Sequence, residues 1–229
     1  QPGEALQLIN FEPSTEGGYR RLNGTTKYNS TIVPQVSSAN ERIQMSAIFN
    51  DKIIAARGGT VSYGNTSGSW TSLATSQGTT YTYDFDKFNF SGTSKIIVAT
   101  GETAAFTIDT SFNVDVINAT GGGTAPTNPK FVKTFANHVF YGGMSNSTHS
   151  IIFSVPFSED NFTSGSGAGE IKVGDVVTGL KVFRDELFIF CQRKIYKLTG
   201  TTTLTFALAE VAKNVGTIAH HSIQELGGD

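Results

Sequence analysis

Ile48-Phe49-Asn50-Asp51-Lys52-Ile53-Ile54-Ala55 decides the fold, because it reads as two apolar strands joined by a two-residue turn. The same phrase recurs at residues 134–141 and 182–189, and a looser copy with a four-residue turn spans 90–98. The polar residue that opens the second strand marks each copy, and successive markers are 43, 43 and 48 residues apart: Lys52, Lys95, His138 and Glu186. A further step of 43 reaches Asp229. A repeat of short strands every ~40–50 residues is typical of the four-stranded blades of a β-propeller.

We therefore predict an all-β fold, a β-propeller built of four-stranded antiparallel blades, of which the chain covers about four to five. Within a unit, residues 42–49 alternate apolar and polar, as a half-buried strand does, and the next strand is continuously apolar. The predicted division is an N-terminal strand and loop segment over 1–40, blades over 41–84, 85–129, 130–172 and 173–218, and the start of a further blade over 219–229.

Three local predictions belong to the second half of the chain. Residues 155–162 suggest a short helical turn with Ser158 as its cap. Residues 171–173 are expected to begin the run that leads into the fourth blade, whose last strand is expected over 204–208. Residues 219–226 are expected to form the outer strand of a fifth blade.

Composition agrees with many short strands. Of 229 residues, 16% are charged and 25 are glycine. This composition is poor in the residues that a helical domain uses. The net charge of −2 gives no basic surface for nucleic acid, and no apolar run is long enough to span a membrane. The single cysteine, Cys191, excludes an intrachain disulfide and lies in an apolar run, where we expect a buried thiol. The chain begins at Gln1 and stops where an inner strand should begin, from which we expect a longer polypeptide.

The competing architecture is a β-sandwich, which also uses short strands at regular spacing. A sandwich has no reason to repeat at 43 residues. Stacked blades do, because each sheet alone exposes an apolar face that its neighbours then bury. The propeller is therefore the preferred fold.

No residue pattern points to catalysis, and we predict no catalytic, cofactor-binding or metal-binding residues and no cofactor. His220 and His221 are adjacent, so on a strand they point to opposite faces, and His149 lies in a loop. His138 occupies a marker position held elsewhere by lysine or glutamate, which predicts a solvent-facing ring. Four aspartates lie at turns or strand ends, where we expect them to be solvated: Asp84, Asp86, Asp109 and Asp115. The turn before Trp70 weakly resembles a sialidase Asp-box turn but is interpreted as an ordinary blade turn.

Two stretches resemble known virion proteins. Asn10-Phe11-Glu12-Pro13 followed by Gly17-Gly18-Tyr19-Arg20-Arg21-Leu22-Asn23-Gly24 resembles the start of structural proteins of tailed bacteriophages. The stretch 130–218 is similar to the tail nozzle, or tail tubular protein B, family of short-tailed phages. Its phrases are the hairpin at 135–140, the Ser-x-Pro-x-x-Phe element at 154–162 and Lys-Ile-Tyr-Lys-Leu-Thr-Gly at 194–200.

That resemblance implies a non-enzymatic structural protein of the phage tail. The expected partners are other copies of the chain in a symmetric ring and tail, adaptor or fibre proteins, and genomic DNA would pass without sequence-specific binding. The expected location is the virion, after synthesis in the host cytoplasm, with no membrane contact.

Two other classes of function stay open. A carbohydrate-binding propeller of a tail fibre or baseplate would stack sugar rings on aromatic side chains, for which the candidates are Tyr63, Trp70, Tyr81 and Tyr83. A cellular propeller scaffold would differ in its gene neighbourhood.

Overall fold

The computed structural model describes residues 11–13, 17–22, 24, 26–35 and 42–225. In this part of the chain, four sheets of four antiparallel strands follow one another, each in simple meander order. The first sheet holds β3 (Ile43–Phe49), β4 (Lys52–Arg57), β5 (Thr60–Gly64) and β6 (Trp70–Ala74). The second holds β7 (Asp84–Phe90), β8 (Thr93–Ala99), β9 (Phe106–Asp109) and β10 (Val114–Val116). The third holds β11 (Phe131–Phe135), β12 (His138–Gly142), β13 (Ser150–Phe153) and β14 (Gly169–Lys172). The fourth holds β15 (Val177–Phe183), β16 (Glu186–Cys191), β17 (Lys194–Thr199) and β18 (Ala207–Lys213).

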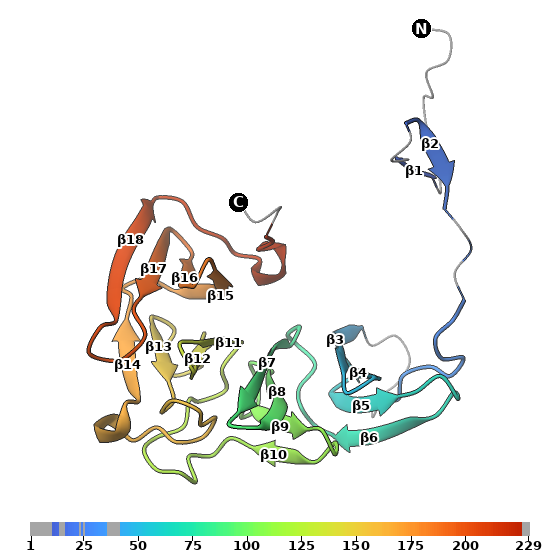
Figure 1. Cartoon of the computed structure of the whole chain (residues 1–229), viewed down its shortest axis with the longest axis horizontal. Coiled ribbons are helices and arrows are strands. Elements are labelled where there is room, and N and C mark those ends of the chain that lie inside the picture. Colours follow the sequence, from blue (N-terminus) through green and yellow to red (C-terminus); the bar gives the residue numbers. More distant parts are fainter. Residues whose placement is uncertain (1–10, 14–16, 23, 25, 36–41, 226–229) are drawn as a thin grey trace, which may run out of the picture.

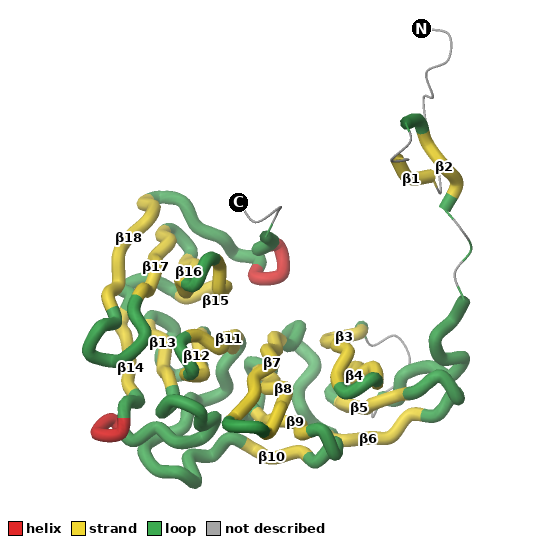
Figure 2. Tube along the Cα trace, in the orientation of Figure 1, coloured by secondary structure: helices red, strands yellow, loops and turns green. Residues whose placement is uncertain are grey.

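The four sheets stand side by side around an arc (Figure 1). In every sheet the first strand lies on the inner side of the arc and the last strand on the outer side. Neighbouring inner strands touch, β11 against β7 and β15 against β11. This is the arrangement of propeller blades, so the predicted fold class is confirmed. A small hairpin of β1 (Phe11–Pro13) and β2 (Tyr19–Arg21) lies apart from the arc (Figure 2).

Each sheet begins with a tight hairpin whose two turn residues both have positive φ. The turn residues are Asn50-Asp51, Ser91-Gly92, Ala136-Asn137 and Arg184-Asp185, with φ between 46° and 103°. Such type I′ turns match the right-handed twist of the strands they join.

The second hairpin differs from its prediction. Its turn has two residues, not four, because Gly92 adopts φ 103° and its N–H donates to Oδ1 of Asn89 at 2.7 Å. Thr93 therefore opens the second strand, and Lys95 stands two residues further along it.

Four other local predictions are corrected. Residues 155–162 form no helix, although the Ser158 hydroxyl does accept the Asn161 N–H at 3.1 Å. Gly169–Lys172 closes the third sheet instead of leading into the fourth. The last strand of the fourth sheet begins at Ala207, since residues before it form a turn capped by the Thr205 hydroxyl. The predicted outer strand from residue 219 is replaced by a one-turn 3-10 helix, η2 (His220–Ser222), in its described part; residues 226–229 lie outside the described residues.

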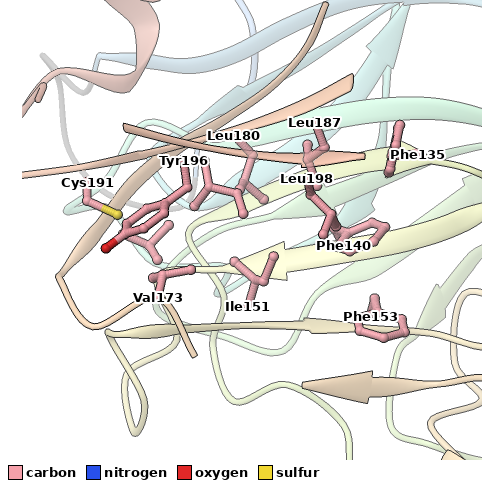
Figure 3. Packing of buried hydrophobic residues seen from close by; sticks show 12 residues of the cluster. Phe135, Phe140, Ile151, Phe153, Val173, Leu180, Leu187, Cys191, Tyr196 and Leu198 are labelled. Carbon is pink, nitrogen blue, oxygen red and sulfur yellow. The ribbon is translucent and has the colours of Figure 1, made fainter. Parts of the chain in front are cut away.

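Hydrophobic clusters fill the spaces between adjacent sheets, one for each pair. Figure 3 shows the cluster between the third and fourth sheets, where Phe140 and Phe153 face Leu180, Leu187 and Leu198. In the first three sheets, the phenylalanine that ends the first strand points to the following sheet and is almost completely buried: Phe49, Phe90 and Phe135. The sheets thus bury on each other the faces that each alone would expose.

Candidate functional site

The segment after β18 returns to the inner side of the arc, and we call residues 214–225 the axial strap (Figure 1). The strap passes close over the end of β16, where the Thr217 N–H donates to the Cys191 carbonyl at 3.0 Å. Gly216 permits this approach, because a Cβ there would lie 2.2 Å from that carbonyl oxygen. The strap then forms η2 beside the inner strands.

A buried carboxylate joins the strap to two sheets. Asp84 lies at the start of β7 and is 6% exposed. Its Oδ2 accepts the N–H of Val132 at 2.9 Å, and its Oδ1 lies 3.1 Å from Nζ of Lys133 and 3.2 Å from Nε2 of His220. The second sheet, the third sheet and the strap therefore meet at one side chain.

The pKa of Asp84 is lowered from its ordinary value. Burial acts to raise this pKa, but the hydrogen bond from His220, the charge of Lys133 and the Val132 N–H together outweigh burial. The carboxylate is thus charged and fully engaged, which fits a structural tie better than an acid or base in catalysis.

Asp86 repeats the arrangement two residues along the same strand. Its Oδ2 accepts both the N–H and the hydroxyl of Thr134, each at 2.7 Å. Lys133 also donates to the Phe85 carbonyl at 2.9 Å. The interpretation of Asp84 and Asp86 as solvated strand ends is therefore wrong. Their spacing of two on one strand was the available signal, because alternate residues share a face.

The histidines of the strap are held differently from each other. The His220 ring lies 4.8 Å from the Phe131 ring, and its Nδ1 is buried without a hydrogen-bond partner among the described residues. His221 borders a groove with Ile43 and Met45 of the first sheet. Burial, and then the neighbouring His220, lower the pKa of His221. The two rings do not converge on a shared ligand, and no group of three or more histidine, cysteine or acidic residues suited to a metal occurs among the described residues.

An open groove of about 410 Å³ runs beside the strap. Its polar lining includes Lys130, Thr178, Gln192 and His221. The Lys130 ammonium stands 4.0 Å from the Tyr81 ring centroid, a cation–π contact.

His138 is buried, not solvent-facing as predicted. Only 1% of it is exposed, its Nδ1–H donates to the Ser154 carbonyl at 2.6 Å, and its ring packs edge-on against Phe153 and Phe206. Burial lowers its pKa, so the ring is neutral at pH 7. The marker position faces the next sheet. The prediction of a solvent-facing ring was wrong because the other marker positions hold polar residues, which suggested exposure to solvent. Cys191 is buried as predicted, and burial raises the pKa of its thiol to about 12.

The aromatic candidates for sugar stacking have partners within the fold. Tyr83 is 1% exposed and donates to the Gly78 carbonyl, Tyr63 stacks on Phe112 with ring centroids 4.2 Å apart, and Trp70 Nε1 donates to the Thr31 carbonyl at 3.0 Å. Tyr63 and Tyr83 both pack in the hydrophobic cluster between the first and second sheets, so their rings serve the packing of the fold.

The turn before Trp70 has a structural counterpart in the second sheet. Asn65 Oδ1 accepts the Ser67 N–H at 3.1 Å, and Asp109 Oδ1 accepts the Ser111 N–H at 2.8 Å. Both turns carry the sequence Asn/Asp-Thr-Ser and lie between the third and fourth strands of their sheets. The blade-turn interpretation agrees with these bonds, and the repeat between units was missed.

Gly179 makes room for the strap, which leads to a testable expectation. A Cβ there would lie 2.5 Å from Cδ1 of Ile223 and 2.7 Å from Nδ1 of His220. Gly179→Ala should therefore lift the strap, speed hydrogen exchange over residues 214–225 and cost about 1–3 kcal/mol of unfolding free energy. Gly165→Ala is the control, since nothing lies within 4 Å of its added Cβ. Unchanged strap exchange in Gly179→Ala would contradict the packing.

No protein-family model matches the chain, and no curated protein does. Among solved structures, it is similar to BBS1N in complex with ARL6DN, at 9% and 12% identity in two crystals with TM-scores of 0.47 and 0.48. These matches cover 73% and 78% of this chain and 52% and 56% of BBS1N, so the chain spans about half of that protein's length. The N-terminal domain of Nup159 matches at 11% identity and a TM-score of 0.41, over 82% of this chain and 54% of that domain.

The extracellular domain of the one-component system BT4673 from B. thetaiotaomicron matches at 12% identity with a TM-score of 0.51. The match covers 84% of this chain and 26% of the BT4673 chain. No helix in the described part of the chain is both long enough and apolar enough to cross a membrane. Identities this low speak for fold alone, and the fold of the described chain is that of stacked β-propeller blades.

Proposed function

We propose that this protein is a non-enzymatic structural component of a tailed-phage virion, a tail or nozzle-type propeller protein. It would assemble with copies of itself and with other tail proteins around the DNA conduit, after synthesis in the host cytoplasm. The first support is the resemblance of residues 130–218 to the nozzle family, since this stretch coincides with the third and fourth sheets and the start of the strap.

The Ser154–Phe162 element of that resemblance has a structural role in this chain. The Tyr141 hydroxyl donates to the Glu159 carbonyl at 3.0 Å, and the Phe162 N–H donates to the Gly122 carbonyl at 2.7 Å. The Glu159 carboxylate also pairs with Lys95 of the second sheet. The loop therefore fastens two blades together, and its residues are engaged in structural contacts.

One observation carries the proposal: the buried and half-buried charged groups on the inner side of the arc bond from one sheet to the next. Asp84 and Asp86 bind β11, Lys133 returns to β7, and His220 brings in the strap. Groups tied in this way make the arc rigid and leave its rims and loops for neighbouring subunits. Rigid shape is the property that a tail platform needs.

The test is to locate the protein in purified particles. Mass spectrometry of virions produced in the native host should detect the chain, and immunogold labelling should place it at the tail. A chain present in infected cells and absent from particles would overturn the proposal. The net charge of −2 further predicts that the purified chain does not retard duplex DNA in a gel.

A further inference from the structure

The fourth sheet exposes a face that the other three sheets bury. Phe49, Phe90 and Phe135 end the first strands of their sheets and are 7%, 8% and 7% exposed, because the following sheet covers each of them. Phe183 is the equivalent residue of the fourth sheet, opposite Glu186 across the hairpin. It is only half-buried and lines an open groove of about 240 Å³.

The second strands of the sheets show the same difference in burial. Ile54, Ile97 and Phe140 point to the following sheet from the second strands of their sheets and are completely buried. Phe188 and Phe190 of β16 have the same orientation, opposite to that of buried Leu187 and Ile189, and both are half-buried in the groove. Together with their cross-strand partners these residues form what we call the open face: Gly179, Lys181, Phe183, Glu186, Phe188, Phe190, Ile195 and Lys197.

The direction of stacking identifies what covers such a face. In all three interfaces of the arc, the covering sheet is the one that follows in the sequence. The chain reaches it by crossing from an outer fourth strand to the next inner strand (Figure 1). The strap makes the same crossing after β18, and Ile223, Gln224 and Glu225 at its end border the groove of the open face.

We propose that the open face is the docking surface of a further four-stranded sheet of the same polypeptide, which enters from the strap. Its contacting row is aliphatic, like Ile96 and Val98 of the second sheet or Leu187 and Ile189 of the fourth. It carries a carboxylate toward Lys181, as the third sheet presents Glu159 to Lys95, whereas Lys197 is already paired with Glu186 at 2.8 Å. This inference rests on the three existing interfaces and is independent of the proposed virion role.

The experiment compares residues 1–229 with the product of the complete reading frame that contains them. Phe188→Cys is introduced into both, and its rate of alkylation by iodoacetamide is measured under native conditions. The native thiol of Cys191 stays silent, because it is buried and its pKa is raised to about 12. We expect fast labelling in residues 1–229 and labelling slower by about tenfold or more in the complete protein, where the interface must open first.

Two controls keep the result decisive. Lys197→Cys probes the same face with a smaller packing change and should show the same protection. Leu204→Cys, at a position 96% exposed, should label equally fast in both proteins. Equal labelling of Phe188→Cys and Lys197→Cys in the two proteins, or a reading frame without a sheet after the strap, overturns the proposal. Absence of the protein from virions would leave it standing.

Discussion

Phe140→Ala is expected to lose about 3–5 kcal/mol of unfolding free energy. Phe140 is completely buried between the third and fourth sheets and touches the rings of Phe135, Phe153 and Phe206. Removing it takes away apolar contacts and leaves a cavity that rigid sheets close poorly. Urea denaturation followed by far-UV circular dichroism measures the loss.

The matched control is Leu204→Ala. Leu204 is 96% exposed, so its truncation should change the unfolding free energy by less than about 0.5 kcal/mol. A loss below about 1 kcal/mol for Phe140→Ala would mean that the third and fourth sheets do not pack as described.

Asp84→Asn is the second large effect, with an expected loss of about 3–5 kcal/mol. The substitution keeps the shape of the side chain but removes the charge that balances Lys133, whose side chain is 16% exposed. The lysine would then be buried beside a neutral amide. The bond from His220 would weaken as well, so the strap should exchange hydrogen faster, as in Gly179→Ala.

Asp84 also leads to a prediction about how the unfolding free energy depends on pH. Its pKa is lowered in the folded protein, because the His220 hydrogen bond and the Lys133 charge outweigh burial. A carboxyl group whose pKa is lower in the folded than in the unfolded protein stabilises the folded state above the unfolded pKa of about 3.9. This stabilisation is lost as the pH falls through the folded pKa. Wild type should therefore lose unfolding free energy on acidification below about pH 4, and Asp84→Asn should lack this component.

The control for the pH series is Asp51→Asn. Asp51 is exposed in the first hairpin turn, where its φ of 58° suits asparagine equally well. Urea titrations of the three proteins between about pH 3 and 7 separate the outcomes. Identical acid profiles for wild type and Asp84→Asn would show that the buried tie does not govern acid stability.

Much of the fold follows from local pattern. The recurring hairpin phrase located the first two strands of every sheet, because turn chemistry and alternation act over a few neighbouring residues. The same reasoning placed the turn of the second hairpin two residues too long, since Asn89 and Gly92 cooperate through a side-chain bond that propensity does not register.

The sequence alone determined that this chain forms repeated antiparallel sheets with an apolar face to bury, because alternation and turn chemistry are local. It also identified Cys191 as a core residue from its apolar neighbours. Only the tertiary structure decided which polar groups are internal. Asp84 and His220 are 136 positions apart in the chain, and His138 is buried by rings from two sheets. The burial of a charge depends on which distant strand covers it, and no stretch of neighbouring residues contains that information.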